Sequence, residues 1–206
     1  MIPRYTPKEM GRIWNDQRRY ETWLRVESVA AEVMAKHGLI PVEAARDIRE
    51  KGSVDAARVE EIERITQHDI IAFTTAVAEQ VGPSSRWMHF GLTSSDVVDT
   101  ALALQLRAAC DALLVDLEML MNAVRDRAEE HSHTPMIGRT HGVHAEPITF
   151  GLKLALWYAE LQRDRDRLRR AREIISVGKI SGAVGTYAHL EPVIEQDVCE
   201  SLGLKP

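Results

Sequence analysis

A long line of apolar residues limits the folds open to this chain more than any other feature of its sequence. From residue 95 to about 128, apolar side chains recur in steps of three or four that follow an eleven-residue period, which matches a nearly straight α-helix. The line comprises Val98, Leu102, Leu106, Ala109, Leu113, Leu117, Leu120 and Val124. Roughly 34 residues at ~1.5 Å each give a rod of about 50 Å. Such a rod buries its apolar stripe in a bundle, within the chain or between subunits.

A second rod is predicted from Pro147, at a plausible first helical position, to about Val177. Its apolar line comprises Leu154, Tyr158, Leu161, Leu168 and Ile175. Charged residues crowd its middle, which is typical of a solvated face. Gly178 ends this helix and begins a Gly-rich loop, residues 178–186, that lacks the order of a phosphate-binding Walker loop. One more short helix is predicted at 191–203.

Shorter amphipathic helices are predicted before the two rods. An extended arm, residues 1–5, should lead to a first helix capped by Thr6, with Pro7 at its first position and Glu9 reaching back. Further helices are expected at residues 16–37, 41–51, 53–66 (capped by Ser53 and Asp55) and 70–81. Aromatic residues make up only 5% of the chain, and Ala, Leu, Glu and Arg favour helix. We therefore predict an all-α fold, with a small N-terminal helical domain over residues 1–92 and the first long helices of a bundle over residues 93–206.

Charge and hydropathy exclude several classes of protein. The formal net charge of −5 argues against a nucleic-acid binder that works by broad phosphate neutralisation. The sequence contains no apolar run of 18 residues, and its N-terminus lacks the apolar core of a signal peptide. We therefore expect a cytoplasmic protein with neither a nucleic-acid partner nor a membrane partner.

Three polar segments between predicted helices carry histidines. His68 precedes a helix, where the helix dipole disfavours the cation and favours neutral imidazole. His89 lies in a loop that leads to Thr93, Ser94 and Asp96, whose spacing predicts a capped helix start that could also bind an anion. The third segment, residues 138–147, is predicted to be a polar turn that presents His141 and His144 between the two rods.

Each segment also has a purely structural interpretation. His68 could be a capping or surface histidine, and Thr93 and Ser94 could simply cap their helix. A zinc site is disfavoured because the His131, His133, His141 and His144 spacing lacks a metal-binding helix pattern. A serine hydrolase is disfavoured because its Gly-x-Ser-x-Gly elbow and its strands are missing. We predict instead acid-base chemistry shared among His68, His89 and His141, gathered by the ends of long helices.

Four motifs in order make the chain resemble the adenylosuccinate lyases of the fumarase/aspartase superfamily. They are Arg-Tyr (4–5), Gln-His-Asp (67–69), Met-His-Phe-Gly-Leu-Thr-Ser-Ser-Asp (88–96) and Gly-Arg-Thr-His-Gly-Val-His-Ala-Glu-Pro (138–147). The resemblance covers nearly the whole chain. It implies β-elimination of fumarate from adenylosuccinate, giving AMP, and from the succinylated aminoimidazole carboxamide ribotide. It also implies no metal and no organic cofactor.

The resemblance assigns roles to individual residues. His141 is expected to be the general acid, with His68 orienting or assisting it. A second set is expected to bind the purine nucleotide substrate: Arg4, Tyr5, Gln67, Asp69, His89, Thr93, Ser94 and Thr140.

One departure from the family limits what the chain could do alone. The base in the family is a serine on a Ser-Ser-x-Met-Pro-x-Lys-x-Asn-Pro loop, which these 206 residues lack. The resemblance therefore implies an N-terminal portion without the rest of the bundle and without the C-terminal domain, inactive as a lyase by itself. The family's site is built from three subunits of a homotetramer, so a homo-oligomer is expected. The alternatives are a sister enzyme such as argininosuccinate lyase, or a non-catalytic helical oligomerisation module.

Overall fold

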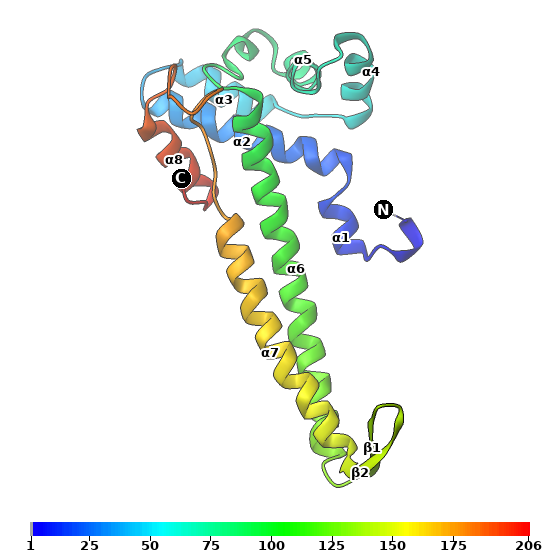
Figure 1. The fold of residues 1–206 in the computed structure, drawn as a ribbon. Helices are drawn as coiled ribbons and strands as arrows, with labels where there is room; N and C mark the ends of the chain where they lie inside the picture. Colours follow the sequence, from blue (N-terminus) through cyan, green and yellow to red (C-terminus); the bar gives the residue numbers. More distant parts are fainter. Residues whose placement is uncertain (1) are drawn as a thin grey trace. The chain divides into compact units, whose positions relative to one another are not determined.

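The structure, a computed structural model, describes residues 2–206 and confirms the helical fold (Figure 1). Its helices are η1 (Pro3–Tyr5), α1 (Lys8–Ile13), α2 (Asp16–Lys36), α3 (Val42–Lys51), α4 (Ala56–Thr66), α5 (Asp69–Val81), η2 (Gly82–Trp87), α6 (Ser94–Glu130), α7 (Phe150–Ile175) and α8 (Pro192–Leu202). Among the described residues, the additions to the predicted helices are the 3₁₀ helices η1 and η2 and a small antiparallel hairpin, β1 (Pro135–Thr140) and β2 (Val143–Thr149).

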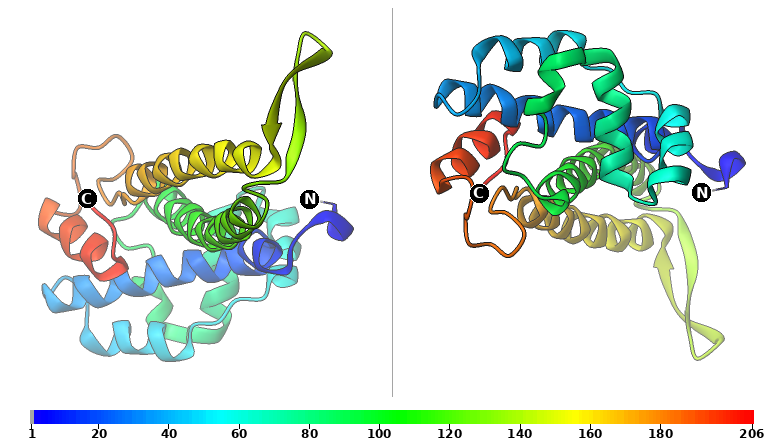
Figure 2. Two further views of the ribbon diagram at one scale, coloured as in Figure 1. Left: turned by 90° about the horizontal axis from the view of Figure 1, so that it is seen from below. Right: turned by 90° about the horizontal axis from the view of Figure 1, so that it is seen from above.

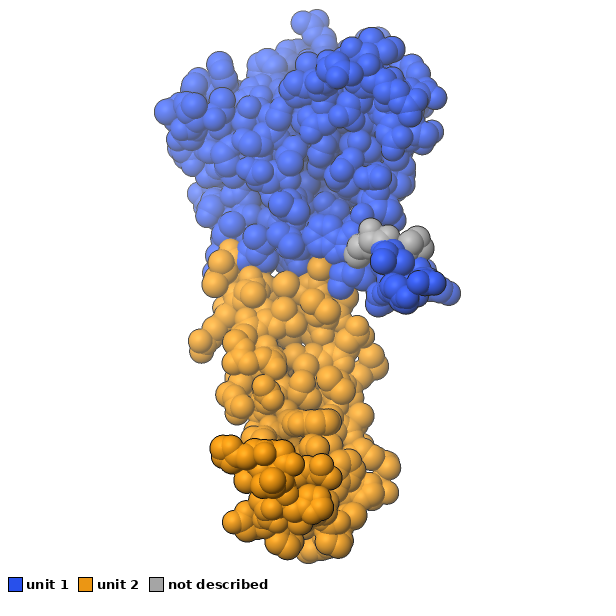
Figure 3. All heavy atoms as spheres, turned by 45° about the vertical axis from the view of Figure 1, so that its right-hand side comes forward, with its two compact units in different colours: residues 1–108, 175–206 blue, residues 109–174 orange. Residues whose placement is uncertain are grey.

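The described chain divides into two compact units (Figure 3). Unit 1 joins the chain up to Ala108 with Ile175–Pro206, and unit 2 is Ala109–Ile174. The long helix α6 therefore belongs to unit 1 in its first part and to unit 2 in its second. The predicted division into domains at residues 92 and 93 stays a prediction.

Helix α2 forms the centre of unit 1. Helices α3 and α8 pack against α2. The last helix of the chain therefore contacts a helix that begins at Asp16, near the N-terminus. Tyr20, Trp23 and Phe73 form an aromatic cluster in the core, with the Trp23 and Phe73 rings 5.5 Å apart and nearly perpendicular. Edge-to-face pairs of this kind add about 0.5–1.5 kcal/mol to the free energy gained by burial.

Most of the predicted helix ends in unit 1 are confirmed. Gly38, with φ +74°, follows the end of α2, and Gly52 caps α3. Asp55 alone caps α4, accepting from the Ala57 N–H at 3.0 Å. The predicted cap at Thr6 is wrong: the Thr6 hydroxyl donates to the Ile2 carbonyl, and Pro7 occupies the capping position of α1 without a side-chain bond. The arm predicted at residues 1–5 contains a 3₁₀ turn at Pro3–Tyr5. Residue 1 of the predicted arm lies outside the described residues.

Unit 2 is an antiparallel pair formed by the second part of α6 and α7, with the hairpin at one end (Figure 2). The predicted polar turn at 138–147 is confirmed only at His141 and Gly142, because the residues on either side of these two belong to paired strands. Pro147 pairs with Ile137 in the ladder, and α7 begins three residues later than predicted. A bulge lies at Gly138, where an added Cβ would meet the Glu146 carbonyl at 2.5 Å. Glycine is required there because backbone approaches so closely.

Part of the apolar stripe predicted on α6 is exposed within this single chain. Leu113 and Leu120 in unit 2 are 45% and 49% exposed, whereas Ala109 and Met121 are buried. On α7, Leu154 of the predicted line is buried, but Leu156, outside that line, is 65% exposed. Unit 2 therefore has apolar surface that its own two helices leave uncovered.

Candidate active site

The start of α6 has the capped geometry predicted from Thr93 and Asp96. The Thr93 N–H donates to Asp96 Oδ2 at 2.9 Å, and the Asp96 N–H donates to the Thr93 carbonyl at 3.0 Å. These bonds fix Thr93 and Ser94 at the N-terminus of a long helix. Free N–H groups and hydroxyls at such a position can bind an anionic group.

Lys179 in the Gly-rich loop pairs with Asp96, whose side chain is fully buried. Lys179 Nζ lies 2.5 Å from Asp96 Oδ1, and it also donates to Ser95 Oγ at 3.1 Å and to the Gly182 carbonyl at 3.0 Å. The Gly182 N–H donates to the same carboxylate oxygen at 3.2 Å. The pair therefore ties the loop at 178–186 to the first turn of α6.

The Lys179 contact was missed at the sequence level. The sequence indicates only a capping role for Asp96, and the loop at 178–186 lacks the phosphate-binding pattern. The two residues are 83 positions apart, and no spacing rule connects groups that meet only through the fold.

His89 contacts a buried carboxylate that sequence reasoning also missed. Glu27, in the middle of α2, accepts from the His89 backbone N–H at 2.9 Å, and one of its oxygens lies 2.6 Å from His89 Nδ1. Burial lowers the pKa of His89, but the hydrogen bond and charge of Glu27, with the charge of Asp96, outweigh it, so the pKa is raised overall. An imidazolium is therefore favoured at His89.

His68 caps α5, as its position before the helix suggested. Its Nδ1 accepts from the Ile71 N–H at 3.4 Å, which requires an unprotonated Nδ1. Gln67 has φ +53° and ends α4, and Asp69 Oδ1 accepts from the Ile70 N–H at 2.7 Å. The capping interpretation of His68 is thus correct in this chain, and its ring remains 45% exposed. Capping leaves Nε2 available to a ligand.

His141 lies at the tip of the hairpin in unit 2. His141 and Gly142 have φ values of +51° and +75° and are the two turn residues between the paired Thr140 and Val143. Positive φ at both positions is the geometry of a type I′ turn. His141 and Thr140 are exposed in this chain.

The remaining predicted binding residues lie near the N-terminus. Arg4 and Tyr5 are in the turn η1, where the guanidinium lies 4.7 Å from the centroid of the Tyr5 ring. Both side chains are exposed. Of the predicted set, His89, Thr93 and Ser94 lie on one short segment of unit 1. The convergence of His68 and His141 on one substrate stays a prediction.

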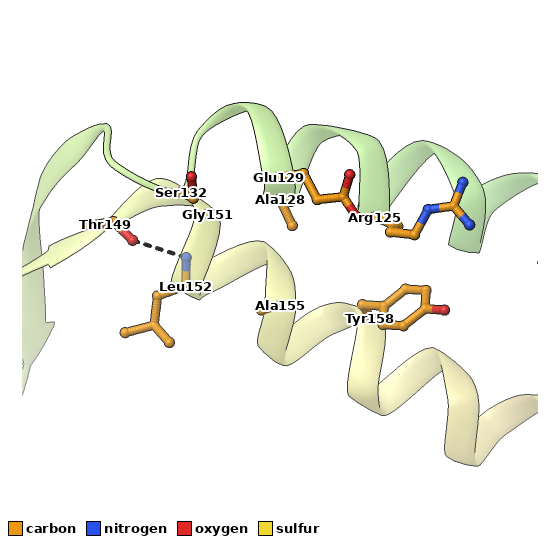
Figure 4. Close-up of a pocket in the computed structure, with 9 residues that line it drawn as sticks. All are labelled: Arg125, Ala128, Glu129, Ser132, Thr149, Gly151, Leu152, Ala155 and Tyr158. Carbon is orange, nitrogen blue, oxygen red and sulfur yellow. Dashed lines mark hydrogen bonds between the residues drawn. The ribbon is translucent and has the colours of Figure 1, made fainter.

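Unit 2 also has an open cavity of about 570 Å³, between the end of α6 and the start of α7 (Figure 4). Its lining is Arg125, Ala128, Glu129, Ser132, Thr149, Gly151, Leu152, Ala155 and Tyr158. None of the predicted site residues is in this lining. Over residues 2–206 no three His, Cys, Asp or Glu side chains are grouped to hold a metal ion. No described helix is both long and apolar enough to span a bilayer.

Two curated relatives match the sequence along its whole length. The chain is 54% identical over 205 residues to the adenylosuccinate lyase of Bacillus subtilis, and 55% identical over 206 residues to that of Synechocystis sp.. Each match takes in 100% of this chain and 48% of the relative. The chain therefore spans about half the length of the curated relatives it matches.

Solved structures show the same fold. A fumarate lyase from Mesorhizobium sp. BNC1 superposes with a TM-score of 0.89 and 28% identity, over 95% of this chain and 48% of that one. The 3-carboxy-cis,cis-muconate lactonizing enzyme of Pseudomonas putida superposes with a TM-score of 0.89 and 31% identity, over 98% of this chain and 48% of that one. The Lyase family profile matches residues 4–205. Since that match takes in nearly all of the sequence, the chain belongs to the Lyase family.

Proposed function

We propose that this chain supplies His68, His89 and His141 to an adenylosuccinate lyase that releases fumarate by β-elimination. The substrates are adenylosuccinate, which gives AMP, and the succinylated aminoimidazole carboxamide ribotide, which gives its amide. The observation that carries the proposal is identity of 54% along the full chain to an enzyme of that name. The solved structures of enzymes with other names are 28% and 31% identical to this chain, so a sister activity is the weaker alternative.

The chemistry needs an acid, a base and stabilisation of negative charge. His141 protonates the leaving nitrogen as general acid, and His68 orients or assists it. Thr93 and Ser94, at the start of α6, bind anionic oxygens of the substrate, together with His89. Arg4, Tyr5, Gln67, Asp69 and Thr140 complete the binding set. The reaction requires no cofactor from this chain, and the base comes from residues outside it.

Assembly with other copies is part of the proposal. A general acid needs a defined orientation and shielding from bulk water, yet His141 is exposed at the tip of the hairpin. The exposed Leu113 and Leu120 of α6 and Leu156 of α7 provide apolar surface on these two helices. We propose that further copies cover this surface in a homotetramer, and that the site is complete only there.

A chimera tests this function. The chain replaces its matched half in the Bacillus subtilis enzyme, and fumarate release is followed with adenylosuccinate and with argininosuccinate. We expect release from adenylosuccinate alone, and loss of roughly 10²- to 10⁴-fold in turnover for His141→Ala, the range for an acid-base group. His133→Ala, an exposed histidine in the connection between α6 and β1, is the matched control and should retain activity.

Three results would count against the proposal. Preferential cleavage of argininosuccinate would favour the sister enzyme. Unchanged turnover after His141→Ala would favour a helical oligomerisation module with no catalytic histidine. Fumarate release at enzymatic rates by the isolated 206-residue chain would contradict the requirement for a base from elsewhere.

A further inference from the structure

The contact between Glu27 and His89 is not explained by packing alone. The Glu27 side chain is 1% exposed, on the buried and mostly apolar face of α2. Both of its oxygens are directed to one residue, at 2.9 Å from the His89 N–H and 2.6 Å from its Nδ1. A buried carboxylate is costly unless it is paired and hydrogen-bonded. His89 provides both bonds recorded for Glu27 among the described residues.

The geometry determines what the other side of the ring can do. With Nδ1–H donating to Glu27, Nε2 lies on the far side of the imidazole from the carboxylate. The His89 side chain is 24% exposed, and its backbone has φ +57°, in the left-handed region. Residues other than glycine adopt that region at a cost, so the surrounding contacts must hold it. His89 lies four residues before Thr93, at the predicted anion-binding start of α6.

We infer that Glu27 is a positioning residue that keeps His89 charged and presents its Nε2–H to an anionic oxygen of the substrate. This inference rests on the proposed function, and it names a residue that none of the sequence motifs contains. Carboxylate and phosphate oxygens share the required chemistry, since both accept charge-assisted hydrogen bonds.

Other charges near His89 are consistent with this role. Burial lowers the pKa of His89, and Glu27 and Asp96 together raise it further than burial lowers it. Lys179 pairs with Asp96 through Oδ1, and this positive charge limits how far Asp96 raises the pKa of His89. His189 lies beside Gly91, two residues along the chain from His89. Glu27 is the only one of these groups with a direct bond to the ring.

Glu27→Gln separates charge from shape. The Gln amide oxygen can still accept from the His89 N–H, and its NH₂ can donate to an unprotonated Nδ1. The variant thus holds the ring in the same place as neutral imidazole. We expect NMR titration of the chain to show His89 losing its proton at lower pH in Glu27→Gln than in the parent. The resonance is assigned by its loss in His89→Asn.

Two further variants complete the titration. Asp197→Asn removes a carboxylate from another histidine, His37, at 2.8 Å on the surface, and should leave the His89 titration unchanged. Should Glu27→Gln not fold, Glu27→Asp keeps the charge but withdraws it from Nδ1, and should lower the His89 pKa part of the way. An unchanged His89 titration in a folded Glu27 variant would overturn the inference.

Kinetics in the chimera test the positioning role itself. Glu27→Gln should raise the KM for adenylosuccinate roughly tenfold at neutral pH, because the Nε2–H of the neutral ring still donates but without its positive charge, with a smaller change in kcat. The KM should recover at lower pH as His89 regains its proton. Inhibition by fumarate and by AMP identifies the anion that His89 contacts. Only the product that carries this anion should inhibit Glu27→Gln more weakly than it inhibits the parent. A KM unaffected by the substitution would overturn the role, whereas an inactive parent chimera would contradict the proposed function instead.

Discussion

Replacing Lys179 by methionine should destabilise unit 1 strongly, because it leaves a buried carboxylate without its cation. Asp96 has no exposed side-chain surface, and Lys179 Nζ lies 2.5 Å from its Oδ1. After Lys179→Met, two backbone donors remain for the carboxylate, the Thr93 N–H at 2.9 Å and the Gly182 N–H at 3.2 Å. They satisfy its lone pairs in part but supply no full positive charge.

The free-energy cost of Lys179→Met should lie at the lower end of the range known for breaking a buried ion pair. Removing one partner of a buried pair costs about 3–5 kcal/mol. The Lys179 side chain is 34% exposed, so water can approach the carboxylate from that side and reduce the penalty. We therefore expect a loss of about 3 kcal/mol. With a urea slope of about 2 kcal/mol per M, the unfolding midpoint should fall by about 1.5 M.

Urea unfolding followed by circular dichroism measures this loss, with Lys51→Met as the matched control. Lys51 pairs with Asp47 at 2.7 Å, but its side chain is 54% exposed, so its loss should cost less than about 1 kcal/mol. Asp96→Asn should also destabilise, because its NH₂ group would face a donor in either orientation, Lys179 Nζ or the Thr93 N–H. The double variant should lose clearly less than the sum of the two single losses. A Lys179→Met chain within about 0.5 kcal/mol of the parent would refute the reasoning.

Three further predictions concern other parts of the chain. Phe73→Ala removes a fully buried ring that contacts Trp23 and should cost about 3–5 kcal/mol in urea unfolding; a loss below 1 kcal/mol would contradict the core assignment. Gly142→Val forces a β-branched residue to φ +75° and should weaken the hairpin by roughly 1–3 kcal/mol, seen as faster amide exchange in β1 and β2; unchanged exchange would contradict the type I′ turn. Burial lowers the pKa of His89, but the hydrogen bond and charge of Glu27 outweigh it, so the pKa of His89 lies above the ordinary histidine value of 6.5. The stability from this pair is therefore complete below pH 6.5 and is lost as pH rises through the folded value; the parent's urea midpoint should fall across that window, and Glu27→Gln should show no such fall.

The helices could be predicted because their ends depend on nearby residues. Gly38 ends α2 through its own positive φ, and Asp55 caps α4 through a bond to Ala57, two positions away. The start of α6 likewise depends on Thr93 and Asp96, three residues apart. Interactions of this range are visible in the sequence as fixed spacings.

The hairpin could not be predicted by the same means. Its strands are largely exposed on both faces, with Val143 60% exposed, so the apolar alternation that indicates a half-buried strand is missing. Pro147 suggested a helix start, although it pairs with Ile137 in a two-stranded sheet, where both strands are edge strands and can accommodate proline. His141-Gly142 was the one local signal, since a glycine in a two-residue loop is typical of a hairpin.

The polar contacts around the candidate site needed the fold itself. Glu27 and His89 are 62 positions apart, and Asp96 and Lys179 are 83 apart. On α2, Glu27 lies next to Val26 within an apolar stripe, where a charged residue gives no indication of its partner. Both pairs form because α2, the first part of α6 and the loop before α8 belong to one compact unit.

The most direct test of the account is a crystal structure of the active chimera with AMP and fumarate bound. We predict that His68 and His141 both lie within hydrogen-bond distance of the bound products, with at least one of the two contributed by another copy of the chain. Products bound away from both imidazoles, or His141 still exposed to solvent in the complete assembly, would contradict it.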